Sequence, residues 1–458
     1  MGYLVMKTCK FDLAMLLLMF TTLGIWFLTN HYSYIYGFLI YCAIFIYLII
    51  KHRPISDFFI VILFSVMSLK GNSGVFEMEY VLITILFAYT VYNIFKQKKI
   101  VVGKMLLPLI CFLLYSGLSI IWTPVLKDGY LGFIGMLEGY LVYFILTNGF
   151  FKIEKKQLNK ISKLATYVML TLSVQIFSVY FTRGFERVLN YKRLVNLGWG
   201  YSNFIAVIFV LLIPLALYKY IDKKHYYFIY FIFDIFNIFA LVLTQSRGAY
   251  VGVIVSLVIF SCFYLRKTML LKYGSIMIIP TSLFIIFFND KFLRLFNVFK
   301  DRFITKDVVD DSGRFELFKL ALNTFFDKFL FGNGLNSGKY MISNNLDNWV
   351  AHYHNFILQI ASALGIIGLI LFGFIVLRWI KILFKPKDAF LTCSAISIIG
   401  GLTHQLLDVS FDLFYFGVYF YGIIAIAEIY RHYNVDEKLK FIAINKLIKN
   451  SDNINNNK

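Results

Sequence analysis

Long apolar stretches recur along almost the whole chain, and this feature most limits how it can fold. A helix needs about 20 mostly apolar residues to cross a bilayer. We predict about fourteen such spans, at residues 11–29, 34–50, 57–70, 75–95, 103–122, 130–150, 161–181, 203–221, 226–243, 249–265, 270–288, 354–378, 388–407 and 412–431. Because lipid offers no hydrogen-bond partner to exposed backbone, the pattern predicts an all-α polytopic membrane protein.

The composition supports a membrane protein over a soluble one. Of 458 residues, 60% are hydrophobic and 15% charged, whereas soluble chains are nearer half apolar. The first apolar stretch follows Lys7 and Lys10 and resembles a signal sequence, but many similar stretches follow, so we interpret it as an uncleaved first helix. All five cysteines lie in or beside apolar stretches without a CxxC pair, which argues against a disulfide framework or a zinc site.

The distribution of basic residues predicts how the chain is oriented. A net charge of +20 could indicate nucleic-acid binding, but Lys and Arg concentrate in alternate connections between the apolar stretches. These connections are residues 51–53, 96–99, 152–163, 219–224, 266–267 and 378–387, and the tail from 431. The positive-inside rule makes them cytoplasmic. We therefore predict that both termini are cytoplasmic and that no nucleic acid is bound.

Two connections on the predicted external side depart from this pattern. The loop at 182–202 contains four cations, Arg183, Arg187, Lys192 and Arg193. The segment 289–353 is the only long hydrophilic stretch before the tail, and long loops are exempt from the charge rule. We predict one membrane domain over 1–434, with 289–353 as a large extracytoplasmic loop, and a frayed polar cytoplasmic tail over 435–458.

Residues 313–330 of the large loop have the spacing of a helix. Their apolar side chains recur at positions 315, 318, 322, 325, 326 and 329. Asp311 or Ser312 can cap the start, and Gly332 stands where a C-terminal glycine is expected. We predict an amphipathic helix that lies on the outer membrane face. Arg314 falls in its first turn, where backbone N–H groups favour an anion, although spacing alone favours a solvated residue.

Two further stretches contain side chains suited to chemistry. Gln245 and Arg247 stand between two apolar runs, where an Arg either snorkels to the interface or points into the bundle and needs an anion. His354 and Asn355 stand where the large loop re-enters the membrane, a place where a lone His is usually structural. His352 and His354 could share a metal, but the sequence shows no third ligand, so we predict no metal site.

Several other polar features have plainer interpretations. The glycines of FGNG at 331–334 indicate a sharp turn rather than a phosphate cradle. His404 and Asp408 are four residues apart near a helix end, which indicates an ordinary local contact. Three acids lie within apolar spans, where charge is costly, and are either functional or paired inside the bundle. They are Glu138, Asp234 and Glu428.

Five short motifs, taken together in order and spacing, carry a family resemblance. They are QSRGA at 245–249, GR at 313–314, FGNG at 331–334, HNFIL at 354–358 and LGIIG at 364–368. Over roughly residues 200–375 the chain resembles the O-antigen ligase/polymerase-like superfamily. The resemblance implies an all-helical fold of the glycosyltransferase-C type and a donor oligosaccharide carried on undecaprenyl diphosphate at the outer face of the bacterial inner membrane.

The resemblance also implies roles for residues of this chain. The catalytic residues would be His354, Arg247 and Arg314, and the two arginines would bind the diphosphate without a metal or another cofactor. Further substrate-binding residues would be Arg193, Asn355 and Gln245, although the cations of the 182–202 loop could equally be plain surface charge. The implied partners are the lipid-linked oligosaccharide, membrane lipids, and a chain-length regulator and flippase of the same pathway.

Four functions are weighed on these grounds. The first is a polysaccharide polymerase of the O-antigen or capsule type, which transfers the growing chain to the non-reducing end of another lipid-linked repeat unit. The second is an O-antigen ligase that uses lipid A–core or another acceptor. A flippase would be expected to show two related halves and a charged central cavity. A non-catalytic assembly partner would leave the convergence of Arg247, Arg314 and His354 unexplained.

Overall fold

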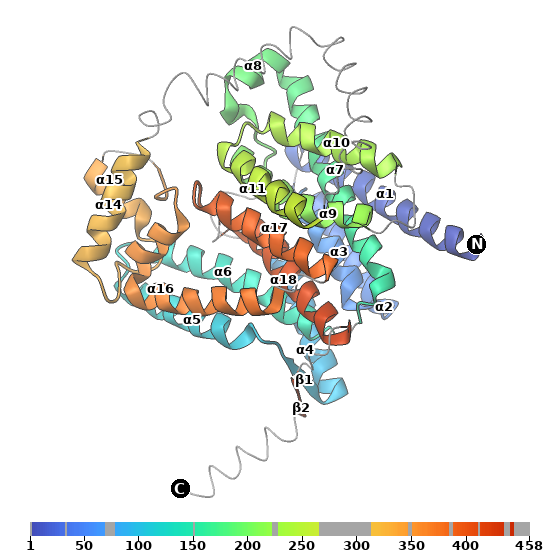
Figure 1. Cartoon of the computed structure of the whole chain (residues 1–458), viewed down its shortest axis with the longest axis horizontal. Coiled ribbons are helices and arrows are strands. Elements are labelled where there is room, and N and C mark those ends of the chain that lie inside the picture. Colours follow the sequence, from blue (N-terminus) through green and yellow to red (C-terminus); the bar gives the residue numbers. More distant parts are fainter. Residues whose placement is uncertain are drawn as a thin grey trace, which may run out of the picture.

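The computed structural model describes residues 2–32, 34–68, 78–149, 152–221, 228–264, 313–346, 350–383, 388–410, 413–434 and 440–443. Within these ranges helices follow one another along nearly the whole chain (Figure 1). The described strands form one antiparallel pair, β1 (Lys99–Val102) with β2 (Lys440–Ala443), with Lys99 opposite Ala443. The predicted all-α fold is confirmed, and part of the predicted tail is paired as β2 rather than frayed.

The helices of the first half are α1 (Gly2–His31), α2 (Tyr34–Ile50), α3 (Ile55–Ser65), α4 (Met78–Gln97), α5 (Leu106–Leu118), α6 (Leu126–Thr147), α7 (Leu158–Arg183) and the short α8 (Phe185–Asn190). Those of the second half are α9 (Ser202–Ile221), α10 (Phe228–Leu243), α11 (Arg247–Tyr264), α14 (Arg314–Asp327), α15 (Gly338–Leu346), α16 (Phe356–Leu383), α17 (Ala389–Gln405) and α18 (Phe414–Asn434). Short 3₁₀ turns adjoin these helices at Ser119–Trp122, Lys155–Gln157 and Lys192–Leu194.

Every predicted span that falls on described residues coincides with a helix, whereas the span predicted at 270–288 lies outside them. By length and composition, six described helices could cross a membrane: Lys10–His31, Leu126–Thr147, Leu158–Arg183, Ser202–Ile221, Arg247–Tyr264 and Phe356–Leu383. Others are apolar but shorter. The chain is therefore a multi-pass membrane protein, while fourteen spans and the glycosyltransferase-C type stay predictions.

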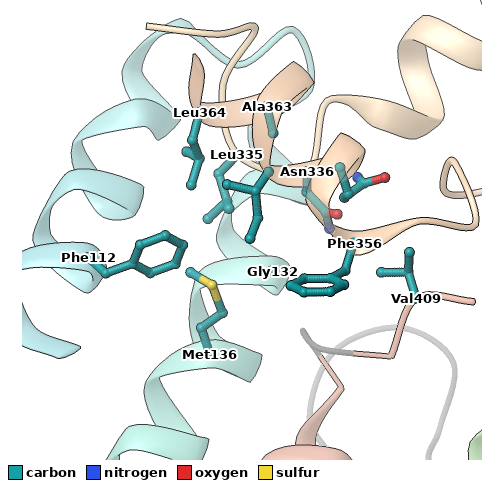
Figure 2. A pocket seen from close by; sticks show the side chains of 11 residues that line it. Phe112, Gly132, Met136, Leu335, Asn336, Phe356, Ala363, Leu364 and Val409 are labelled. Atoms are coloured by element: carbon teal, nitrogen blue, oxygen red, sulfur yellow. The ribbon is translucent and has the colours of Figure 1, made fainter. Parts of the chain in front are cut away.

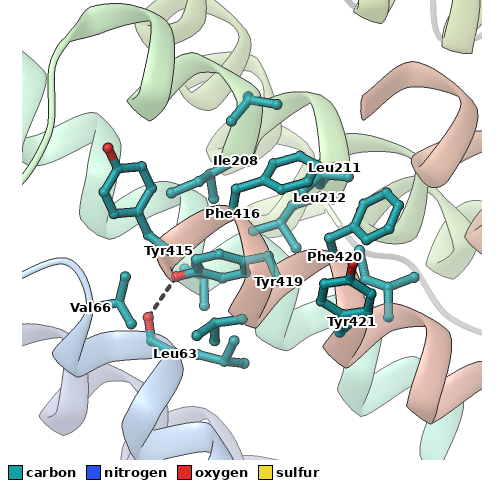
Figure 3. Close-up of a cluster of buried hydrophobic side chains, with 14 of the residues drawn as sticks. Leu63, Val66, Ile208, Leu211, Leu212, Tyr415, Phe416, Tyr419, Phe420 and Tyr421 are labelled. Atoms are coloured by element: carbon teal, nitrogen blue, oxygen red, sulfur yellow. Dashed lines mark hydrogen bonds between the residues drawn. The ribbon is translucent and has the colours of Figure 1, made fainter. Parts of the chain in front are cut away.

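Helix α9 forms the centre of the bundle because it is apolar on all sides, and a helix of this kind is stable only when surrounded. It packs against α7, α10, α11, α17 and α18. Figure 3 shows the aromatic face of α18, including Phe416, against Leu211 of α9 and the end of α3. There the Tyr419 hydroxyl donates to the Leu63 carbonyl over 2.6 Å. The two halves of the chain thus share one core.

Glycines bring α11 and α17 together at their closest approach. A Cβ atom at Gly252 would lie 2.8 Å from the Gly400 carbonyl oxygen, which leaves room only for hydrogen at that position. Small residues of this kind allow transmembrane helices to pack closely. One turn earlier, a Cβ at Gly248 would lie 3.3 Å from the His404 ring. The start of α11 is therefore held against the end of α17.

Helices α14 and α15 lie at one end of the bundle, and the N-terminus lies at the opposite end (Figure 1). We call the former the α14 end. The predicted loop helix exists as α14, and its predicted apolar stripe is mostly outward: Phe315 is 77% and Phe326 67% exposed. Leu317 and Ala321 face inward instead and pack near Tyr353, because the loop supplies its own partners. The predicted caps Asp311 and Ser312 lie outside the described residues.

Candidate functional site

The glycine motifs of the loop and of α16 form one backbone joint. Helix α16 is broken at Gly365, whose φ is 64° and ψ −162°. The backbone N–H of Asn333 donates to the Ser362 carbonyl over 2.9 Å. A Cβ at Gly332, where φ is 70°, would lie 2.4 Å from the Ala363 carbonyl oxygen. The predicted turn is confirmed, and this joint fixes α14 relative to the start of α16.

A buried chain of hydroxyl groups reinforces the joint next to the histidines. Thr324 of α14 lies 2.8 Å from the Ser362 hydroxyl. Ser362 donates to the Tyr353 hydroxyl over 3.3 Å. Tyr353 is fully buried and directly precedes His354. The segment that carries His354 is therefore held by α14, the helix that begins with Arg314.

Two of the predicted site residues adopt a left-handed backbone conformation. The φ of both Gln245 and His354 is 55°, a region that non-glycine residues rarely occupy outside functional or strained sites. Gln245 ends the turn from α10 into α11, and its side-chain amide donates to the Leu189 carbonyl over 3.1 Å. Gln245 thus fixes the turn that leads into α11, whose first residue is Arg247.

His354 lies against Asp408, a carboxylate that comes from the segment after α17. Its Nδ1 is 3.3 Å from Asp408 Oδ1. His352 Nε2 lies 3.6 Å from the same oxygen. The backbone N–H of His354 donates to His352 Nδ1 over 3.3 Å. Because His352 accepts at Nδ1, it presents an Nε2–H to the carboxylate. The contact predicted between His404 and Asp408 exists in the backbone, but the Asp408 side chain faces the two histidines.

The electrostatics of this group follow from burial and proximity. Burial by itself would raise the pKa of the Asp408 carboxyl, but the hydrogen bond with His354 and the neighbouring histidines hold that pKa well below its usual value. Burial, then the nearby His354 and Arg314, lower the pKa of His352 to about 4 against the opposing effect of Asp408. At neutral pH Asp408 is therefore ionised and His352 neutral. An ionised Asp408 favours the proton of His354 on Nδ1, which leaves Nε2 free to act as a base.

Arg247 and Arg314 bring two guanidinium groups to the same place. Burial lowers the pKa of Arg314, the nearby Arg247 lowers it further, and Asp408 opposes both effects. Arg314 Nε is buried and has no hydrogen-bond partner within the described residues. A buried donor without an acceptor costs about 1–3 kcal/mol. The site therefore favours an anion with several oxygens, placed between the arginines and His354.

The other predicted substrate-binding residues have different positions. Asn355 caps α16, since its Oδ1 accepts from the backbone N–H of Leu358 over 3.1 Å, and its Nδ2 donates to the Leu406 carbonyl over 3.2 Å. Arg193 is exposed, and no contact between it and the histidines exists in the part of the chain that the structure describes. Its neighbour Lys192 points inward instead and donates to Asn203.

Sequence reasoning missed Asn203 and the role of Asp408. Asn203 Nδ2 donates to Asp408 Oδ2, although the two residues are 205 positions apart. Asp408 and His354 are 54 positions apart. The one available signal was that both polar residues stand near span ends on the same predicted side of the membrane as His354.

A metal could in principle occupy the same group. One nitrogen each from His352 and His354 and one Asp408 oxygen lie within 4.8 Å of one another, so the third ligand that the sequence did not reveal is present. However, His352 could bind through Nε2 only with a proton on Nδ1, and that nitrogen accepts the His354 N–H. The neighbouring guanidiniums also oppose a cation. The group suits hydrogen bonding and an anion better than a divalent metal.

An apolar cavity shares a wall with the site (Figure 2). Phe112 of α5, Met136 of α6 and Phe356 of α16 surround it. Val409, which directly follows Asp408, closes one side. Because Phe356 lies only two residues after His354, the cavity and the cationic group are adjacent. An apolar cavity beside a cationic group suits an amphiphilic ligand.

Two of the three intramembrane acids, Asp234 and Glu428, are paired inside the bundle. Asp234 accepts from Lys219 over 2.6 Å and from Tyr220 over 2.7 Å. Glu428 accepts from the Tyr143 hydroxyl over 2.5 Å and from the backbone N–H of Lys104 over 2.6 Å. The plainer of the two interpretations, pairing within the bundle, accounts for both.

Comparison with known proteins agrees with the motif pattern. Residues 232–373 match the family model described as O-antigen ligase. No curated protein matches the chain. The matched region contains Gln245, Arg247, Arg314 and His354, whereas Lys192, Asn203 and Asp408 lie outside it.

Proposed function

Because residues 232–373 match the O-antigen ligase family, whose members are glycosyltransferase-like enzymes, we propose that the chain is a polysaccharide polymerase of the O-antigen or capsule type. It transfers a glycan chain from undecaprenyl diphosphate to the non-reducing end of another lipid-linked repeat unit. The reaction takes place at the outer face of the bacterial inner membrane, and both termini of the chain are cytoplasmic.

The observation that carries this proposal is the convergence of two guanidiniums on a histidine–carboxylate pair. Arg314 interacts electrostatically with Arg247 and Asp408, and Asp408 contacts His354. A transferase that uses a lipid diphosphate must bind the leaving diphosphate and take a proton from the acceptor hydroxyl. In the proposal the two arginines bind the diphosphate and His354 takes the proton.

In the proposed reaction, N–H groups of Arg247 and Arg314 donate to the diphosphate oxygens. His354 Nε2 removes the proton of the acceptor hydroxyl while the acceptor oxygen attacks the anomeric carbon and the bond to the phosphate oxygen breaks. The guanidiniums stabilise the charge that grows on the diphosphate, and Asp408 stabilises the imidazolium. A single displacement of this kind inverts the anomeric configuration. Because the guanidiniums supply the positive charge, the proposed mechanism requires no metal.

The apolar surfaces near the site support a lipid-linked substrate. The cavity beside His354 is lined mostly by apolar side chains, with the amides of Asn336 and Gln359 among them, and the outward face of α14 presents exposed phenylalanines. An exposed apolar face at the end of a membrane bundle suits the lipid interface. We propose that these surfaces accommodate lipid around the diphosphate, and that a chain-length regulator and a flippase act with this protein.

An O-antigen ligase is the second candidate. The matching family model is itself described as O-antigen ligase, and the same donor chemistry would serve a lipid A–core acceptor. Polymerase and ligase differ only in the acceptor. A flippase is less favoured, because the two arginines and the histidines gather at one end of the bundle rather than along a central path.

Reconstitution in liposomes tests the proposal. The purified protein is supplied with a lipid-diphosphate repeat unit, with and without chelator, and products are separated on a gel. We expect a ladder from the wild type in both conditions, and none from Arg247→Ala, Arg314→Ala or His354→Ala. Transfer only to an added second acceptor would identify a ligase. Labelled lipid that crosses the bilayer without any transfer would refute the enzyme and favour a flippase, whereas loss of the ladder with chelator would refute metal independence.

A further inference from the structure

Asp408 is held from both sides by side chains of different segments. Its Oδ1 faces His354 at 3.3 Å and accepts the backbone N–H of Val409 over 2.9 Å. Its Oδ2 accepts from the Asn203 side-chain amide. Only 4% of the Asp408 side chain is exposed. The carboxylate therefore cannot rotate without losing a hydrogen bond on at least one oxygen.

Lys192 fixes the orientation of the Asn203 amide. Lys192 Nζ donates to Asn203 Oδ1 over 2.5 Å. Since an ammonium group can only donate, the Asn203 oxygen must face Lys192 and its NH₂ must face Asp408. The three side chains form a directed chain of hydrogen bonds that begins with a cation and ends at the carboxylate beside His354. A reversed Asn203 amide would place two donors against each other.

The loop that carries Lys192 is itself fastened to the first half of the protein. Trp26 of α1 donates its ring N–H to the Leu197 carbonyl over 2.7 Å. Arg183 at the end of α7 donates to the Leu194 carbonyl over 2.8 Å. Both acceptors follow Lys192 closely within the loop at 182–202. Helices α1 and α7 therefore determine where Lys192 stands.

We propose that Asn203 and Lys192 form a positioning arm that holds Asp408, and through it His354, in the arrangement needed for transfer. The inference rests on the proposed function and deepens it. It makes the 182–202 loop part of the working site, although this loop lies outside the region that matches the family. Both are positioning residues, since each acts on the substrate only through Asp408 and His354.

The arm also sets the charge around the base. His352, His354 and His404 act electrostatically on Asp408, Arg314 acts on His352, Arg247 acts on Arg314, and Lys192 acts on His404. Lys192 is also joined to Asp408 through Asn203. Loss of the Lys192 charge removes one cation from this group, so the acid limb of the rate profile should move to higher pH.

The test uses the full-length protein in liposomes with the lipid-diphosphate repeat unit. Asn203→Leu keeps the number and branching of the side-chain heavy atoms and removes both hydrogen bonds, and we expect kcat to fall about 100-fold with a nearly unchanged KM for the donor. For Lys192→Met we expect kcat to fall about tenfold and the acid limb to rise by about half a pH unit. Lys192→Arg keeps the charge and a donor and should retain both wild-type properties.

The matched control is Arg187→Met, which removes an exposed cation from the same loop and should change neither kcat nor the pH limb. Thermal unfolding in detergent identifies variants that are merely misfolded. If Asn203→Leu fails to fold, Lys192→Met still tests the positioning arm. The positioning arm would be overturned if the wild type transfers glycan and both Asn203→Leu and Lys192→Met match its rate and pH profile. That outcome would leave the proposed function intact. A wild type without transfer would instead overturn the proposed function.

Discussion

Two clusters of charged side chains lie toward opposite ends of α9, and they differ in how their charges are satisfied. Asn203, at the start of α9, contacts Asp408 and hence the cationic group at the α14 end. Lys219, near the other end of α9, is fully buried and donates to Asp234 and Thr166 over 2.6 and 2.7 Å. The second cluster also contains a Lys163–Asp12 pair at 3.2 Å.

The balance of charge separates a structural cluster from a working site. Around Lys219 and Asp234, two lysines face two aspartates, and tyrosine hydroxyls complete the hydrogen bonds. At the α14 end, two guanidiniums lie near each other and near the single Asp408 carboxylate, and the buried Arg314 Nε–H has no hydrogen-bond partner within the described residues. A balanced cluster stabilises the fold by itself, whereas a surplus of positive charge becomes stable only when an anion arrives.

Removal of the surplus charge should have the largest effect. We expect Arg247→Ala or Arg314→Ala to lower kcat by about 100- to 1,000-fold, because in the proposed mechanism each guanidinium stabilises the leaving diphosphate. Thermal stability should stay the same or rise, since like charges no longer repel. The measurement is initial rate in liposomes alongside unfolding in detergent. A variant that loses stability and activity together would place these arginines in the structural class.

Disruption of the balanced cluster should give the opposite result. Asp234→Ala leaves the buried Lys219 ammonium unpaired, and loss of one partner from a buried pair costs about 3–5 kcal/mol. We expect a large fall in the unfolding temperature with a nearly normal rate per folded molecule. The matched control is Asp12→Ala, whose carboxylate is more exposed, so a smaller loss is expected. A normal melting temperature for Asp234→Ala would contradict the structural assignment.

Substitution of Asp408 should affect both activity and stability, because this carboxylate is paired and also belongs to the candidate site. Asp408→Asn should lower kcat about 100-fold by removing the charge that stabilises the His354 imidazolium. A depressed pKa means that the carboxylate stabilises the fold at all pH values above its ordinary pKa, and that this stability is lost only as pH falls through the depressed value. Acid unfolding curves of wild type and Asp408→Asn should therefore differ near neutrality and converge only in strong acid. Parallel curves would contradict the depressed pKa.

The smallest effect on catalysis is expected for Arg193, a cation of the 182–202 loop that belongs to neither cluster. Arg193 is exposed and separate from the histidines in the described structure. Arg193→Met should change kcat and the donor KM by less than about twofold, since isolated exposed charges contribute little. Comparison with Lys192→Met sharpens the contrast, because the two cations are adjacent in sequence. A large rise in donor KM for Arg193→Met would restore its predicted role in substrate binding.

The family match covers only part of the residues that form the candidate site. The region 232–373 supplies the arginines and His354, while Asp408 comes from beyond it and Asn203 and Lys192 from before it. The first half of the chain resembles the family only as a multi-span membrane protein, yet α1 and α7 fasten the loop that holds Lys192. The motifs therefore nominate the candidate reacting groups, while the residues that contact Asp408 come from elsewhere in the bundle.

Periodicity and motif order were enough to predict the local features. Apolar length determined the helices, and glycine pairs determined the turn at 331–334, because these properties depend on neighbouring residues alone. The nomination of Arg247, Arg314 and His354 came from the family resemblance. That they form a transferase site stays a prediction, although the structure brings them together.

Tertiary structure decided which surfaces and partners these elements meet. The sequence predicted the helix α14 but not its orientation, because Leu317 and Ala321 face inward only once Tyr353 and α15 cover them. The Asp408–His354 and Asn203–Asp408 contacts join residues 54 and 205 positions apart. Such contacts arise from the packing of α9, α11 and α17 around a shared core, and no local pattern encodes them. The sequence by itself thus determined the helices and nominated the candidate reactive groups, while packing determined which carboxylate contacts the histidine and which cations come together.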